Sequence, residues 1–78
     1  MRCTFVNNGT PYSFWAGNWT QHPWRDRRVT MFEVHGEMAL EAMDDGRQED
    51  TYLLNSKGDR MNADGIKRYI RFLREQNR

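Results

Sequence analysis

Residues 62–76 have the sequence NADGIKRYIRFLREQ, and this stretch decides the fold. Its apolar side chains recur at spacings of three and four residues, which places them on one side of an α-helix. Asn62 is a favourable N-cap, and Asp64 lies in the first turn, where a negative charge complements the helix dipole. We therefore predict a helix from Ala63 to about Gln76. An isolated helix of this length is marginal in water, so its apolar stripe must pack on a sheet. The stripe consists of Ile66, Tyr69, Ile70 and Leu73.

The opposite surface of the same helix is basic. Its cations recur at spacings of four, three and four residues, so they lie within about 60° of each other around the helix axis. They are Lys67, Arg71, Arg74 and Arg78, with Arg68 beside them. A row of guanidinium groups suits phosphates or a surface rich in carboxylates. This stripe predicts a contact with nucleic acid or with an acidic protein. The alternative is a solvated helix face whose cations lie near the negative end of the dipole.

The first fifteen residues predict a β-hairpin. Two strand-like segments, 2–7 and 10–15, flank Asn8-Gly9, a dipeptide that favours a type I′ turn. Pro11 cannot donate a backbone hydrogen bond, so the second strand should lie at an edge of the sheet. Trp15 ends that strand, and we expect its large ring to belong to the core.

The middle of the chain predicts further strands. Residues 28–35 contain Val29, Met31, Phe32 and Val34 and indicate a strand, which Gly36 ends with a turn. Residues 37–43 suit either a short helix or a strand. We favour the strand, because the flanking glycines leave little room for a helix. A hairpin turn at Asp44-Asp45-Gly46, a third strand over 49–55 and a turn over 56–59 then follow.

These elements predict one α+β domain covering residues 1–78. We expect a small antiparallel sheet of three to five strands with one C-terminal α-helix packed on one face. A chain of 78 residues can bury only a modest core, and the 13% of aromatic residues must supply much of it.

Charge is segregated along the chain. The net charge is +1, but residues 37–59 sum to −5 and residues 60–78 to +4. The carboxylates around the predicted hairpin turn, here called the acidic cluster, are Asp44, Asp45, Glu49 and Asp50. Such a cluster can imitate a row of phosphates and occupy a basic groove on a partner. Two alternatives stay open. The turn can be a solvated guard of strand edges, or it can pair with the basic helix within the fold.

A loop rich in tryptophan and arginine is predicted over residues 16–26 and its neighbours. Trp and Arg are enriched at binding hot spots, and aromatic rings with nearby arginines also suit nucleic-acid bases. The alternative is that these rings belong to the core, although we expect one of the two tryptophans to be partly exposed. The predicted contact residues are Trp19, Trp24, Arg25, Arg27 and Arg28.

No catalytic, cofactor or metal site is predicted. Cys3, His22 and His35 are far apart in the sequence, and zinc sites need ligands at characteristic spacings. The acidic cluster does not follow the EF-hand ligand spacing. No glycine-rich phosphate loop or nucleophile motif occurs. One cysteine, no visible export signal and no apolar run of about 20 residues lead us to expect a cytoplasmic protein with no membrane partner.

Two similarities of layout accompany these patterns, neither carried by a motif. The strand–strand–strand–helix order predicted for the last fifty residues resembles small DNA-binding sheets, such as integrase amino-terminal and AP2-type domains. The small size and mixed charge clusters are similar in style to phage-encoded proteins that block host or defence machinery, including anti-CRISPR proteins.

The functional expectation is a small non-enzymatic protein-binding module. It would inhibit or regulate a larger protein or protein–nucleic acid complex through its charged and Trp/Arg patches. The alternative is a nucleic-acid-binding module that uses the basic helix and the segment Arg25–Arg28; the near-neutral net charge disfavours it. A homodimer is compatible with this size, because small domains often supplement their core by association.

Overall fold

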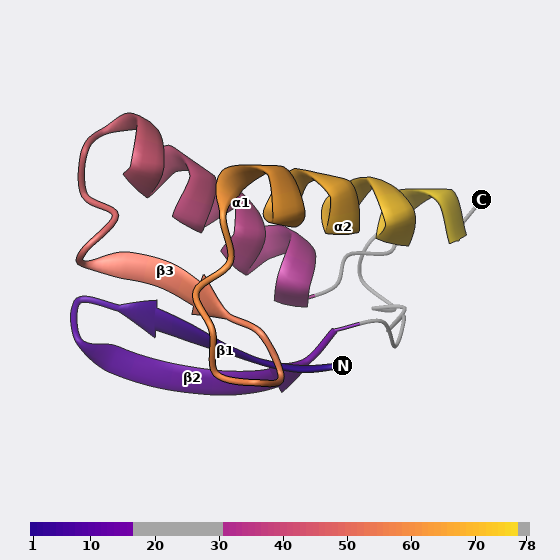
Figure 1. Cartoon of the computed structure of the whole chain (residues 1–78), viewed down its shortest axis with the longest axis horizontal. Coiled ribbons are helices and arrows are strands. Elements are labelled where there is room, and N and C mark those ends of the chain that lie inside the picture. The colour runs from indigo at the N-terminus through magenta and orange to yellow at the C-terminus, as the bar shows by residue number, and fades with distance from the viewer. Residues whose placement is uncertain (17–30, 77–78) are drawn as a thin grey trace, which may run out of the picture.

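The computed structural model describes residues 1–16 and 31–76. They form β1 (Arg2–Asn7), β2 (Thr10–Trp15), α1 (Met31–Asp44), β3 (Thr51–Leu54) and α2 (Ala63–Gln76). Both helices lie on the same side of a three-stranded sheet (Figure 1). The predicted α+β class, with an antiparallel sheet and a C-terminal helix, is confirmed. There is one helix more than the sequence led us to expect.

The amino-terminal hairpin forms as predicted. The sheet has the order β2-β1-β3, with β1 antiparallel to both neighbours, so β2 is an edge strand as Pro11 indicated. Asn8 and Gly9 have φ values of 51° and 83°, which is the backbone that a type I′ turn requires. The predicted third strand is confirmed in its central part as β3. The turn after it is closed by Asn55, whose side-chain oxygen accepts hydrogen bonds from the backbone N–H groups of Lys57 and Asp59.

The core lies between the sheet and the two helices. The predicted α2 stripe is buried in it: Ile66, Ile70 and Leu73 are at most 6% exposed, and Tyr69 packs against them. The predicted N-cap is confirmed, because the Asn62 side chain accepts a hydrogen bond of 2.8 Å from the Gly65 N–H. The remaining buried members of this cluster are Cys3, Phe5, Ala16, Phe32, Ala39 and Leu53.

Residues 31–44 are a helix, so the strands predicted over 28–35 and 37–43 are wrong wherever the structure describes them. Gly36 is a buried residue inside this helix and not a turn. The helical signal is a row of mostly small residues at spacings of four, three and three: Phe32, Gly36, Ala39 and Ala42. With this helix in place, the layout resemblance to three-strand DNA-binding sheets is lost.

The segment Asp44-Asp45-Gly46 ends α1 and is not a hairpin turn. The Arg47 N–H donates to the Ala42 carbonyl at 2.7 Å, and the Gly46 N–H donates to the Met43 carbonyl at 3.3 Å. Gly46 has φ 75°. These two bonds and the left-handed residue form a Schellman cap. A glycine after two aspartates therefore marked a helix end, which looks the same in sequence as the start of a hairpin.

Gly36 sets the distance between the two helices. A Cβ atom at this position would lie 3.0 Å from Cδ1 of Ile70 and 3.1 Å from Cγ2 of Ile66. A side chain at this position would therefore require Ile66 and Ile70 to shift. The absence of a side chain on α1 is therefore what lets the α2 stripe reach the core.

We expect Gly36→Val to destabilise the protein by about 1–3 kcal/mol, the usual cost of overpacking a well-packed core. Urea unfolding followed by circular dichroism would measure it. The matched control is Glu41→Val at an exposed position of the same helix, where only helix propensity changes and the cost should stay below about 1 kcal/mol. Equal losses in the two variants would contradict a packing role for Gly36.

His35 is part of the core packing. Its ring stacks on Phe5 at 4.2 Å between centroids and 10° between planes, and it meets Phe14 edge-on at 5.0 Å. Burial lowers the pKa of His35 from its usual 6.5. The side chain therefore has a structural place among aromatic rings in this fold.

This environment predicts a pH dependence of stability. Because the unfolded chain binds a proton at His35 near pH 6.5 and the folded chain binds it only at lower pH, the free energy of unfolding should fall as pH drops below 6.5. His35→Phe keeps a ring in the stack. In this variant the urea midpoint should depend much less on pH between pH 7.5 and pH 5.5, roughly the window above carboxylate titration. The variant His22→Gln measures how much the other histidine contributes to this pH dependence. If the urea midpoint of His35→Phe changed with pH as steeply as that of the wild type, His35 would not be its source.

Candidate functional site

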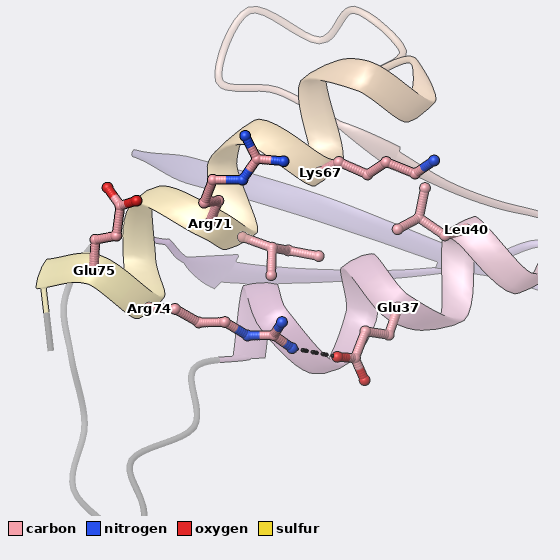
Figure 2. A pocket seen from close by; sticks show the side chains of 7 residues that line it. Glu37, Leu40, Lys67, Arg71, Arg74 and Glu75 are labelled. Atoms are coloured by element: carbon pink, nitrogen blue, oxygen red, sulfur yellow. Dashed lines mark hydrogen bonds and ion pairs between the residues drawn. The ribbon is translucent and has the colours of Figure 1, made fainter. Parts of the chain in front are cut away.

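A groove runs between α1 and α2 on the outer surface of the helical layer (Figure 2). Its volume is about 400 Å³, and it is open to solvent. Side chains of both helices line it: Glu37 and Leu40 from α1, and Lys67, Ile70, Arg71, Arg74 and Glu75 from α2. Three of the four cations of the predicted basic stripe therefore meet in one place.

The groove combines an apolar centre with charged walls. Ile70 is buried and Leu40 is half-buried against the core, so together they form the apolar part. Lys67 and Arg71 are exposed on the α2 side and make no ion pair within the described residues. They lie one helical turn apart, about 6 Å along the axis. This spacing suits two negative groups on one ligand.

Arg74 links α2 to α1 beside the groove. Its Nε donates to Oε1 of Glu33 at 2.7 Å, and its terminal nitrogen donates to Oε1 of Glu37 at 2.7 Å. The hydrogen bond to Glu33 makes the largest contribution to raising the pKa of Arg74. Arg74 is thus committed to α1. The sequence could not reveal this pairing, because it placed both glutamates outside any helix.

The other predicted cations of α2 lie elsewhere. Arg68 is exposed on the opposite flank, beside Tyr69 and Phe72. Phe72 is 46% exposed and contacts Tyr69 at 5.7 Å between ring centroids, so it extends the surface rather than the core. Arg78 lies outside the described residues.

The acidic cluster lies in and beside the loop between α1 and β3, at the end of the molecule opposite the C-terminal end of α2 (Figure 1). All four of its residues are exposed. Asp45 pairs with Arg47 at 3.1 Å, and Glu49 pairs with Arg60 at 3.5 Å. None of the four pairs with a described cation of α2. The acidic cluster and the described cations of the α2 stripe therefore lie on separate parts of the surface and do not pair with each other.

Most of the predicted tryptophan and arginine contact surface cannot be located in the structure. Trp19, Trp24, Arg25, Arg27 and Arg28 lie outside the described residues. Trp15 was expected in the core, but it is 61% exposed. It pairs with Arg2 across the hairpin, whereas its neighbour Phe14 pairs with the buried Cys3. Since adjacent strand residues face opposite sides of a sheet, burial of Phe14 turns Trp15 outward.

Within residues 1–16 and 31–76, no three His, Cys, Asp or Glu side chains gather closely enough to hold a metal ion. Cys3 is a free, buried thiol, and burial raises its pKa. Over the same residues, no helix is long and apolar enough to cross a membrane.

Comparison with known proteins found no matching family model, no matching curated protein and no matching solved structure. The chemistry of the surface must therefore carry the functional conclusion.

Arg74 bridges the two helices, whereas Arg71 forms no ion pair with a described residue. We expect Arg74→Gln to lower the free energy of unfolding by about 0.5–1 kcal/mol, because it removes two exposed ion pairs between the helices. Arg71→Gln, three residues earlier on α2, should change it by less than about 0.5 kcal/mol. Urea unfolding at low and high salt measures both. A salt-independent loss of the same size in the two variants would contradict this division.

Proposed function

We propose that this protein is a non-enzymatic protein-binding module, which inhibits or regulates a larger complex by occupying one of its surfaces. The observation that carries the proposal is the groove between α1 and α2. It offers two uncommitted cations, Lys67 and Arg71, beside the apolar side chains of Leu40 and Ile70.

The chemistry of the groove favours a protein ligand. Binding sites on proteins combine an apolar centre that excludes water with a polar rim. Glu37 is paired with Arg74, so the groove offers Lys67 and Arg71 as two neighbouring cations, which is fewer than the row of phosphate contacts by which nucleic-acid-binding proteins hold a backbone. A partner segment with two carboxylates one helical turn apart and an apolar side chain next to them matches the two cations of α2 and the apolar centre. An acidic amphipathic helix has this arrangement.

The acidic cluster supports a second contact with the same complex. Asp44 and Asp50 make no ion pair with a described residue, so two of the four negative charges of the cluster are not offset by an arginine. A partner complex with a basic surface, such as one that binds nucleic acid, would attract it. The narrower expectation of a phage-encoded anti-defence protein stays a prediction.

Nucleic-acid binding is the second candidate. It is favoured by three exposed cations on α2, namely Lys67, Arg68 and Arg71, that form no ion pair with a described residue. Phosphates would use these cations without needing the apolar centre of the groove. The two candidates therefore differ in their dependence on Leu40.

We propose the cytoplasm as the location, because a reducing compartment keeps the lone thiol of Cys3 unpaired. An enzymatic function is not proposed. His35 is committed to ring stacking with Phe5 and Phe14.

The test uses a fluorescently labelled helical peptide with glutamates at positions i and i+4 and leucine at i+3. In anisotropy titrations at low salt, we expect the double variant Lys67→Glu with Arg71→Glu to weaken binding about tenfold or more, since two attractive contacts become repulsive. Leu40→Gln should also weaken it. The matched control is Arg2→Glu, an exposed cation on β1 that is not part of the groove.

A labelled single-stranded DNA oligonucleotide, titrated in parallel, distinguishes the candidates. DNA binding that survives Leu40→Gln and falls steeply with salt, without peptide binding, would replace the first proposal by the second. Binding of neither probe by the wild type would overturn both. Urea unfolding of each variant verifies that the fold is retained.

A further inference from the structure

Within residues 1–16 and 31–76, the outer edge of β2 has no pairing partner. In the order β2-β1-β3, the central strand β1 is hydrogen-bonded to a neighbour along both of its edges. The far edge of β3 is partly covered by the chain that follows it, through the bridge between Leu54 and Arg60 and the hydrogen bond from the Met61 N–H to the Leu53 carbonyl. Along β2, no described segment pairs with the side that faces away from β1.

The hydrogen-bond alternation of the hairpin identifies which backbone groups face outward. Met1 and Ala16 exchange two hydrogen bonds, at 2.7 and 2.8 Å. In an antiparallel pair, residues alternate between this hydrogen-bonded type and the other type, whose N–H and C=O groups point away from the partner strand. The outward-pointing residues of β2 are therefore Pro11, Ser13 and Trp15. Pro11 fits this position, because its missing N–H would have pointed out of the hairpin.

The side chains of β2 do not protect this edge. The strand has the sequence TPYSFW and carries no charge. Natural edge strands are usually guarded by lysine, by inward-pointing charges or by bulges, and β2 has only Pro11. Tyr12 on the helix-facing side is 52% exposed, and Trp15 on the other side is 61% exposed. Both faces of the edge thus offer aromatic surface next to unpaired backbone.

We propose that β2 pairs antiparallel with β2 of a second copy of this chain, so that two three-stranded sheets join into one sheet of six strands. The two-fold axis passes through Ser13, which exchanges two backbone hydrogen bonds with Ser13 of the second copy. The N–H of Trp15 donates to the carbonyl of Pro11 in the second copy, and by symmetry the Trp15 N–H of the second copy donates to the carbonyl of Pro11 in the first. In this register the midpoint of β2 lies on the two-fold axis, and no backbone N–H points at a proline ring.

The same register matches the side chains. Trp15 lies opposite Pro11 of the second copy on the outer face, and Tyr12 lies opposite Phe14 on the helix-facing side. Aromatic pairs of this kind are among the stabilising cross-strand contacts. No charged side chain opposes another, because β2 has none. A second copy is favoured over an unrelated strand because the edge is complementary to itself, and because a domain of 78 residues gains stability from association.

Sedimentation equilibrium of the full chain tests the proposal. We expect a species of twice the 9.4 kDa chain mass at micromolar to millimolar concentration. Ser13→Lys places two like charges directly opposite across the axis and should give a 9.4 kDa monomer. Ser13→Thr, which adds bulk without charge, should remain dimeric. Tyr12→Lys, at an exposed position, is a second disrupting variant should Ser13→Lys fail to fold.

Amide hydrogen exchange gives an independent measurement. Ser13 and Trp15 amides should be protected in the wild type and exchange rapidly in Ser13→Lys, while the amides that β2 donates to β1 stay protected in both. A wild type that is monomeric over the whole concentration range would overturn the proposal. A dimer that persists in both lysine variants would overturn it equally, because it would place the interface elsewhere. Neither result bears on the α1–α2 groove.

Discussion

The contact between Gly36 and the two isoleucines of α2 is the constraint on which the rest of the structure depends. A Cβ atom at Gly36 would lie only 3.0–3.1 Å from these side chains, so α1 and α2 pack closely where α1 has no side chain. That closeness seals the core above the sheet. It also brings Glu33 and Glu37 within reach of Arg74 and leaves Lys67 and Arg71 beside the apolar side chains of the groove. One missing side chain thus determines both the packing and the shape of the candidate site.

Much of the fold could be predicted because the local sequence signals of β1, β2 and α2 agreed with one another. The hairpin had a turn dipeptide between two strand-like segments, and α2 had an N-cap, an acidic first turn and an apolar stripe. In α1 the signals conflicted. Its buried face is built mainly from Gly36, Ala39 and Ala42, which carry little hydrophobicity of their own. A helix whose inner face is defined by small size becomes recognisable only when the isoleucines that need the space are in place.

The candidate site was predictable in its parts but not in its assembly. The basic stripe of α2 followed from helical geometry alone, and three of its four members are described on one flank. The partner of Arg74 depended on α1, so the error over residues 31–44 hid Glu33 and Glu37. For the same reason, the acidic cluster appeared to be the best candidate within the chain for pairing with the basic helix. The cluster lies past the Schellman cap, and the ion pairs that α2 forms are with α1 instead.

The topology of the sheet also sets an order of events when the chain is made on a ribosome. β1 is the central strand, and its two partners lie at very different distances along the chain: β2 follows after a two-residue turn, whereas β3 begins at Thr51. The hairpin can therefore form early, but one ladder of β1 stays open until α1 and β3 have emerged. The buried side chains of Phe5 and Cys3 are covered later still, because α2 follows β3 in the chain and closes the core. Until α1, β3 and α2 join it, the hairpin has an uncovered apolar side and only marginal stability of its own.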